Sequence, residues 1–123
     1  MLKYERTGEI DVMNYGRELL KGSTDTLLLS LINFQPLYGY QIIKDLEKRS
    51  KGYFLFKEGT LYPALHRLEK SGLIRSKWEK LSNGQERRYY YITEKGQHAL
   101  IERLETWRDF YTAVNLIMSP SVA

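Results

Sequence analysis

The chain has 123 residues, the size of one ordinary domain, and a formal net charge of +4. It contains no cysteine and only two separated histidines, which excludes disulfide frameworks and thiolate zinc sites, and we expect no metal. The sequence has no nucleophile–base pair, paired-carboxylate motif or phosphate-binding glycine loop, so we expect neither an enzyme nor a bound cofactor.

Residues 1–16 have no sustained helical or strand period, so we expect an N-terminal arm there. They also lack the apolar region of a secretion signal, and the longest aliphatic run, residues 27–29, is far too short to span a bilayer. The sequence therefore predicts a cytoplasmic protein without membrane association.

Two helices are predicted next, within a domain at residues 17–93. The first follows Gly22, has apolar residues at helical spacing, and ends before Pro36, which disfavours helix in the preceding residue. The second runs from Gly39 to about Ser50 and is closed by Gly52, with Ile42, Ile43 and Leu46 on its buried side.

The third predicted helix covers residues 58–72. Leu61, Leu65 and Leu68 recur at positions i, i+4 and i+7 and form a core stripe. Pro63 is tolerated because it lies in the first turn, and Gly72 is a natural stop. The opposite face carries groups that can bind base edges, thymine methyls and phosphates, namely Thr60, Tyr62, Pro63, His66, Arg67 and Lys70.

A β-hairpin follows the third helix. Two strand-like runs at residues 73–81 and 85–93 flank an Asn-Gly pair at residues 83–84, which is typical of a tight turn. A two-residue turn would set Trp78 opposite Tyr89 and Lys80 opposite Arg87. The second pair is an unfavourable like-charge contact, so a longer turn remains open. Three helices followed by a basic hairpin are the order of a winged helix-turn-helix.

The charge is uneven along the chain. Residues 39–96 carry 13 Lys and Arg against 7 Asp and Glu, whereas the segments on either side are close to neutral. A local basic excess suits a phosphate-binding module, although an ordinary solvated surface would also allow it.

The last predicted helix, residues 94–118, starts after the capping hydroxyl of Thr93, and a tail of residues 119–123 follows. Its apolar stripe is longer than a small three-helix core can cover. We therefore expect this helix to hold a homodimer together. The expected interface residues are Leu100, Leu104, Trp107, Phe110, Tyr111, Val114 and Met118.

Four segments, taken together and in order, resemble the PadR family of transcriptional regulators. They are residues 18–25 (ELLKGSTD), 38–40 (YGY), 59–69 (GTLYPALHRLE) and 87–93 (RRYYYIT). The resemblance implies a mainly α fold with a small antiparallel hairpin, a winged helix-turn-helix and a long C-terminal dimerisation helix. It also implies a dimer that represses transcription at a palindromic operator, with the third helix in the major groove and the hairpin near the DNA backbone.

The candidate DNA-binding residues lie on the second helix, the third helix and the hairpin. They are Tyr38, Tyr40, Thr60, Tyr62, Pro63, His66, Arg67, Asn83, Gly84, Arg87 and Arg88. Each also has a structural interpretation. Tyr62 can be a packing residue, the ring of either Tyr38 or Tyr40 can fix the entry into the helix, and the arginines can keep a strand edge soluble.

A single helix after the hairpin makes the chain similar to the short members of the family, which puts phenolate sensing in doubt. Trp107 stands where such members place an interface aromatic, so the resemblance suggests a planar hydrophobic effector between the subunits. The plain alternative is that Trp107 is interface core. Tyr91 and Ile92 depart from the family pattern, and no backbone contact is expected at Tyr91.

The rival function is a winged helix that binds protein or RNA without operator specificity, since the fold alone does not dictate function. Salt-sensitive binding and preference for a palindrome over random duplex would favour the DNA-binding regulator.

Overall fold

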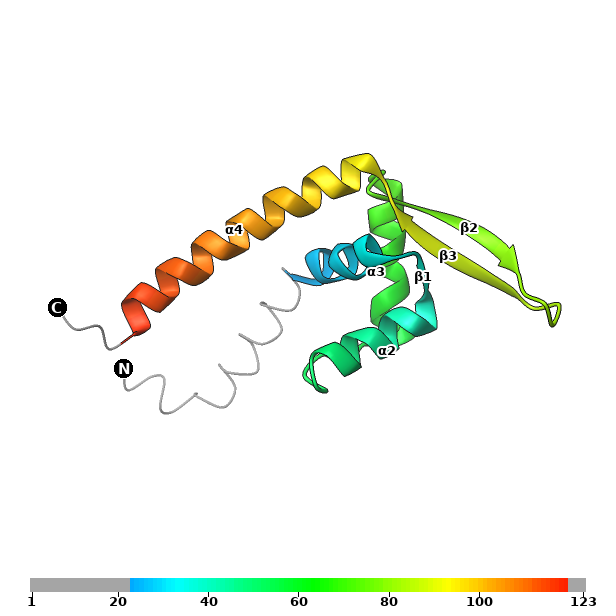
Figure 1. Ribbon diagram of the computed structural model, residues 1–123, viewed down its shortest axis with the longest axis horizontal. Helices are drawn as coiled ribbons and strands as arrows, with labels where there is room; N and C mark the ends of the chain where they lie inside the picture. Colours follow the sequence, from blue (N-terminus) through cyan, green and yellow to red (C-terminus); the bar gives the residue numbers. More distant parts are fainter. Residues whose placement is uncertain (1–22, 120–123) are drawn as a thin grey trace.

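The computed structural model describes residues 23–119. The predicted N-terminal arm, the start of the expected DNA-binding domain at residues 17–22 and most of the predicted tail lie outside these residues. The described elements are a helix at residues 23–34, β1 Leu37–Tyr38, α2 Gly39–Arg49, α3 Glu58–Lys70, β2 Ile74–Lys80, β3 Glu86–Ile92 and α4 Glu94–Met118 (Figure 1). This is the predicted winged helix-turn-helix with a long C-terminal helix, and the fold class is confirmed.

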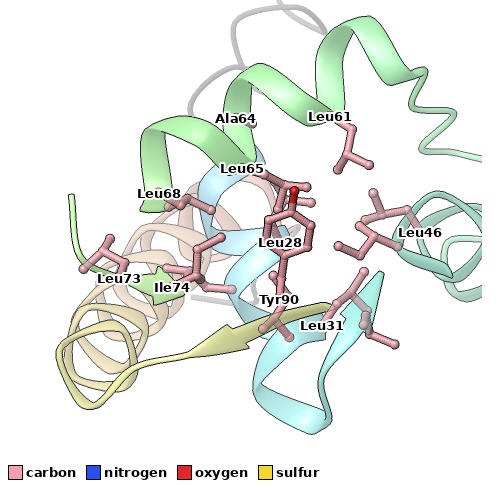
Figure 2. Packing of buried hydrophobic residues seen from close by; sticks show 14 of the residues in the cluster. Leu28, Leu31, Leu46, Leu61, Ala64, Leu65, Leu68, Leu73, Ile74 and Tyr90 are labelled. Carbon is pink, nitrogen blue, oxygen red and sulfur yellow. The ribbon is translucent and has the colours of Figure 1, made fainter. Parts of the chain in front are cut away.

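The core lies where the first three helices meet the base of the sheet. Helical residues Leu28 and Leu65 are almost fully buried, and Ile74 and Tyr90 of the hairpin pack into the same cluster (Figure 2). The leucine stripe expected on α3 is the part of that helix that is buried, together with Ala64. Burial of apolar side chains on one face fixes which face of α3 remains exposed.

Strand β1 is an addition to the sequence-based prediction. It pairs with β3, so that the sheet has the antiparallel order β1-β3-β2. Because β1 leads directly into α2, this pairing attaches the start of α2 to the base of the hairpin. A two-residue strand is too short to show a period, which is why the sequence pattern did not reveal it.

The hairpin register differs from the one that a two-residue turn would give. Trp78 pairs with Arg88 and Lys80 with Glu86, so the predicted pairing of Trp78 with Tyr89 is wrong. The carbonyl of Leu81 accepts from the amide of Gly84 at 2.9 Å, and Gly84 adopts φ 89°. This is a three-residue turn closed by a glycine bulge. It replaces the like-charge contact at Lys80 with an opposite-charge pair.

The end of α2 also differs in detail from the prediction. The amide of Lys51 bonds the carbonyl of Lys48, and the amide of Gly52 bonds that of Glu47 at 2.7 Å. The first left-handed residue after α2 is therefore Lys51, with φ 53°, and Gly52 follows it with φ 84°. A non-glycine residue in this conformation is uncommon and costs some backbone strain.

Helix α4 has the predicted bounds, and the hydroxyl of Thr93 accepts from the amide of Gly96 at 3.0 Å as the expected cap. Its 25 residues span about 37 Å, and the helix extends well away from the other elements (Figure 1). Leu100 is buried at its start, whereas Phe110, Ile117 and Met118 are largely exposed. No helix within residues 23–119 combines the length and apolar character needed to cross a membrane.

Candidate nucleic-acid interface

The exposed side of α3 carries all the polar residues that the sequence places there. Thr60, Tyr62, Pro63, His66 and Arg67 are exposed, and so is Lys70. Four buried residues on the opposite side hold the helix against the core, which makes this face a fixed platform. Whether it contacts DNA remains a prediction, since exposure alone does not identify a partner.

The residues on this face differ in how directly they point outward. Successive residues turn by about 100° around a helix, so the residues opposite the leucine stripe are Gly59, Pro63, His66 and Lys70. Arg67 lies on one flank, where its guanidinium is 3.8 Å from Asp25 of the first described helix. Asp25 also lies 3.9 Å from Arg103 of α4. Arg67 is thus drawn toward the other helices, and His66 and Lys70 occupy the centre of the face.

Tyr62 lies on the opposite flank and packs against Gly39 at the start of α2. A Cβ atom at position 39 would overlap the hydroxyl and ring of Tyr62, so only glycine allows this approach. The side chain of Tyr62 nevertheless remains 44% exposed. The packing and binding interpretations of Tyr62 are therefore compatible, because the side chain packs on Gly39 and still has exposed surface.

Tyr38 and Tyr40 have different environments. The ring of Tyr38 packs edge-on against Tyr89 with centroids 5.4 Å apart, and the guanidinium of Arg87 lies 4.3 Å from its centre. The amide of Tyr38 donates to the side chain of Gln41, which fixes the entry into α2. Tyr40 is largely exposed two positions later. Tyr38 is thus mainly a packing residue, and Tyr40 is the one free to reach a ligand.

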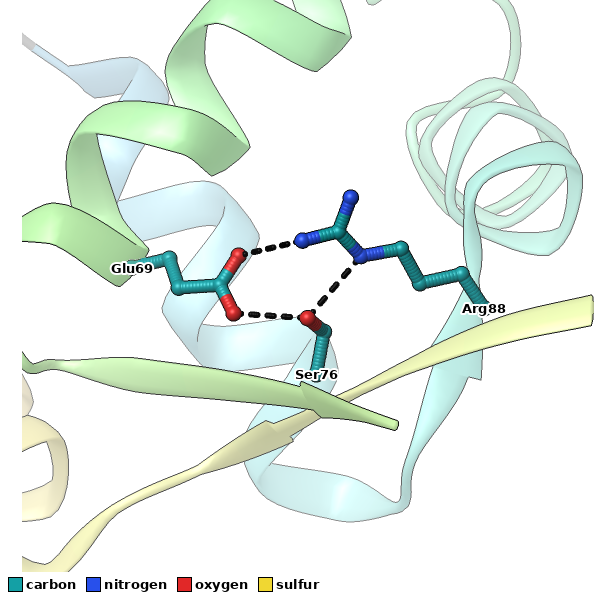
Figure 3. Close-up of polar contacts among 3 residues, drawn as sticks. All are labelled: Glu69, Ser76 and Arg88. Carbon is teal, nitrogen blue, oxygen red and sulfur yellow. Dashed lines mark hydrogen bonds and ion pairs between the residues drawn. The ribbon is translucent and has the colours of Figure 1, made fainter. Parts of the chain in front are cut away.

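The two hairpin arginines point to opposite faces of β3. Arg87 faces Glu79 across the sheet and covers Tyr38, whereas Arg88 turns toward α3. The guanidinium of Arg88 donates to Glu69 at 3.0 Å and to the hydroxyl of Ser76 at 2.9 Å (Figure 3). Side chains alternate across a strand, so neighbouring arginines cannot act as a pair on one surface. Asn83 and Gly84 form the exposed tip.

The pKa values of two tyrosines of β3 are raised. Burial raises the pKa of Tyr90, which packs beneath α3. The pKa of Tyr91 is raised mainly because its hydroxyl donates to the carboxylate of Glu79 at 2.6 Å. Both hydroxyls therefore stay protonated at neutral pH, and neither adds negative charge to the hairpin.

Sequence reasoning missed Glu69 and Ser76 as members of this region. Glu69 is an acidic residue within an otherwise cationic stretch of α3, and that contrast was the available signal. Its partners lie 7 and 19 residues further along the chain, in β2 and β3, and a helical period does not relate residues that lie in different elements.

The residues expected at a dimer interface all lie along α4. Among them Leu100 is buried, Val114 is half-buried, and Leu104, Trp107, Phe110, Tyr111 and Met118 are partly or largely exposed within this chain. Trp107 is 41% exposed and packs edge-on against Phe110 with centroids 6.4 Å apart. The apolar surface of α4 is thus present as predicted, and its partner is a matter of proposal.

Comparison with known proteins identifies relatives of this chain. Residues 28–102 match the Transcriptional regulator PadR-like family. A transcriptional regulator of Mycobacterium tuberculosis is 41% identical over 86 residues, which cover 70% of this chain and 77% of that protein. A PadR-like transcriptional regulator from Bacillus cereus is similar in structure, with a TM-score of 0.75 and 33% identity over 85% of this chain and 99% of the other.

A PadR family regulator from Eggerthella lenta is similar along nearly the whole chain. It superposes with a TM-score of 0.75 and 28% identity, covering 98% of this chain and 100% of that structure. The same arrangement of helices, hairpin and C-terminal helix therefore occurs in regulators of transcription.

Proposed function

The chain belongs to the PadR-like family of transcriptional regulators, and on this premise we propose that it binds a specific double-stranded DNA sequence through α3 and the hairpin. The observation that carries the proposal is the anchoring of α3. Its leucines are buried, while His66, Lys70 and Tyr62 form one exposed polar face. A rigid helix with such a face suits the major groove, which is wide enough to admit an α-helix.

The hairpin supports the same function from beside α3. Its exposed cations, Lys77 and Lys80 on β2, suit contacts to the phosphate backbone, which position a protein without reading sequence. Tyr40 on the first turn of α2 is largely exposed, so its hydroxyl is a further group that suits phosphate. Base readout is assigned to α3 and backbone contact to the hairpin and α2.

We further propose that the working form is a homodimer joined through α4. The supporting observation is the apolar surface that α4 exposes from Leu104 to Met118, which the other elements of residues 23–119 leave uncovered. Two copies would present two α3 helices, and a two-fold dimer reads a palindrome whose half-sites are about 34 Å apart. Repression follows if this operator overlaps a promoter.

An effector site is proposed at the same interface. Trp107 is partly exposed and has Phe110 against it, so its indole can stack on a planar hydrophobic compound between the two copies of α4. Binding of such a compound would change the separation of the α3 helices and release the operator.

The test is a shift assay with the DNA just upstream of the chain's own gene, repeated from low to high salt. We expect a discrete complex, a steep loss of affinity with salt, and a clear preference over random duplex of equal length. Binding that ignores sequence and salt, or binding only to RNA, would instead favour the adaptor or RNA-binding function.

A further inference from the structure

Three side chains connect the hairpin to α3 in a closed ring of hydrogen bonds, here named the Glu69–Ser76–Arg88 network. One carboxylate oxygen of Glu69 accepts from Arg88 at 3.0 Å, and the other accepts from the hydroxyl of Ser76 at 2.6 Å. The same hydroxyl accepts from Nε of Arg88 at 2.9 Å (Figure 3). Each of the three groups therefore bonds both of the others.

The network joins α3 to both long strands of the hairpin. Glu69 lies near the end of α3, whereas Ser76 and Arg88 come from β2 and β3 and lie on the sheet face that turns toward α3. The planar guanidinium uses two of its donors at a fixed angle, which constrains direction as well as distance. The ring thus links the C-terminal part of α3 to one position on each strand.

The charges of these residues contradict a simple phosphate-binding role. An acidic side chain on a helix that binds DNA repels the phosphates, so Glu69 should weaken DNA binding unless it has a structural role. Its carboxylate pairs with Arg88 at 3.0 Å, so that guanidinium is engaged within the chain although the side chain is 43% exposed. Arg87, on the other face of β3, has no ion pair within residues 23–119.

We propose that Arg88 is a positioning residue, which acts through Glu69 and Ser76 to hold the hairpin and α3 in the relative orientation that specific DNA binding needs. This inference rests on the proposed DNA-binding function. It replaces the expectation that both Arg87 and Arg88 contact DNA, and it adds Glu69 and Ser76 to the residues that determine specificity.

The decisive variant is Glu69→Gln, because the two explanations predict changes of opposite sign. Removal of a negative charge near DNA should strengthen binding to every duplex if only electrostatics matter. If the network sets the orientation, binding to a duplex that the parent chain selects from random-sequence DNA should weaken by about tenfold. Binding to a scrambled duplex of equal length should not weaken. Glu58→Gln, which makes the same charge change in the first turn of α3, is the matched control and should show no loss of preference.

Arg88→Lys and Ser76→Ala separate positioning from phosphate contact. Both keep the charge of the chain, but lysine lacks the guanidinium fork and alanine lacks the bridging hydroxyl. We expect each to lose preference for the selected duplex while the slope of log affinity against log salt stays unchanged. Arg87→Gln, which removes a cation available to phosphate, should instead make that slope shallower by about 0.9 for each phosphate that is no longer neutralised.

Circular dichroism and thermal melting of every variant show whether it folds. If Glu69→Gln fails to fold, Ser76→Ala, which removes only one hydroxyl, still tests the proposal. The proposal is overturned if the parent prefers its selected duplex and Glu69→Gln binds it as tightly or more tightly. It is also overturned if Arg88→Lys and Ser76→Ala keep the parent's preference. If the parent itself selects no duplex, the proposed DNA-binding function fails and the positioning role fails with it.

Discussion

Helices α3 and α4 carry apolar residues at similar helical spacing, but within residues 23–119 only the stripe of α3 is covered. Leu61 and Leu65 of α3 are at most 1% exposed. Trp107 of α4 is 41% exposed, and Ile117 is 84% exposed. The difference shows that periodicity identifies the apolar face of a helix, whereas the length of the helix relative to the core decides whether the same chain can cover that face.

The outward faces of the two helices differ as well. On α3 the exposed surface is polar and lies beside a cationic hairpin, which suits DNA. On α4 the exposed surface beyond Leu104 includes an apolar stripe with Trp107 and Phe110, which suits a second copy of the chain. Substitutions on the outer face of α3 should therefore change DNA binding, and those on α4 should change assembly.

The largest effect is expected from Trp107→Ala. If the indole is fully packed against a partner subunit, its loss should cost about 3–5 kcal/mol, part of it as dissociation of the dimer. Operator binding should fall as well, although no DNA-binding group is removed, because the two copies of α3 are no longer held together. Sedimentation at micromolar concentration with a parallel shift assay measures both effects.

Trp78→Ala is the matched control for that substitution, because it removes the other tryptophan from the exposed surface of the hairpin. It should leave the sedimentation coefficient unchanged. A dimeric Trp107→Ala variant that binds DNA normally but no longer binds planar dyes would assign Trp107 to the effector site alone. A variant unchanged in assembly, DNA binding and dye binding would remove both roles.

Leu65→Ala tests the other half of the comparison. This side chain is 1% exposed in the centre of the core, so its truncation should lower the free energy of unfolding by about 2–5 kcal/mol. Because its cover comes from the same chain, the stability difference from the parent should not depend on protein concentration. Chemical denaturation at two concentrations, about tenfold apart, checks this. A strong concentration dependence would mean that α3, like α4, is completed by a partner.

Substitution of His66 by Ala addresses the polar face of α3. His66 lies opposite the buried stripe, so its loss should weaken specific DNA binding by about 1–3 kcal/mol and leave the melting temperature almost unchanged. Tyr62→Ala should behave similarly but also lower stability, because its ring packs on Gly39. If a triple variant that also includes Arg67→Ala binds its operator as tightly as the parent, α3 is not the recognition helix.

Most of the fold could be predicted from the sequence because its signals are local. Leucine spacing and Thr93 as a cap each act within a few residues, and the helices appear where these signals indicate. The placement of Pro63 in the first turn is wrong, because α3 begins at Glu58 and the proline lies inside the helix. The hairpin register could not be derived with the same certainty. Its turn length depends on whether Gly84 closes a bulge, and a change of one residue moves every side chain to the other face.

The candidate site was predicted only in part, for the same physical reason. Exposure of the outer residues of α3 follows from the helical period, which is a local property. The partners of Arg88 and Arg67 are set by packing between distant segments, and no period relates Glu69 to Arg88 or Asp25 to Arg67. In the sequence alone, an arginine that pairs with a distant segment cannot be distinguished from one on the open surface.

The smallest effect is expected from substitution of Asp25, which forms an ion pair with one arginine of α3 and one of α4. Asp25 lies 3.8 Å from Arg67 of α3 and 3.9 Å from Arg103 of α4, and all three side chains are partly exposed. Exposed pairs of this kind contribute about 0–1 kcal/mol and weaken with salt. Asp25→Asn should therefore lower the free energy of unfolding by less than about 1 kcal/mol, with the difference disappearing in high salt. Asp45→Asn, on the neighbouring α2, provides a control of equal charge. A loss of unfolding free energy several times larger that persists in high salt would mean that Asp25 holds α3 and α4 together. DNA binding by α3 and assembly through α4 would then be coupled, and the two helices would not act independently.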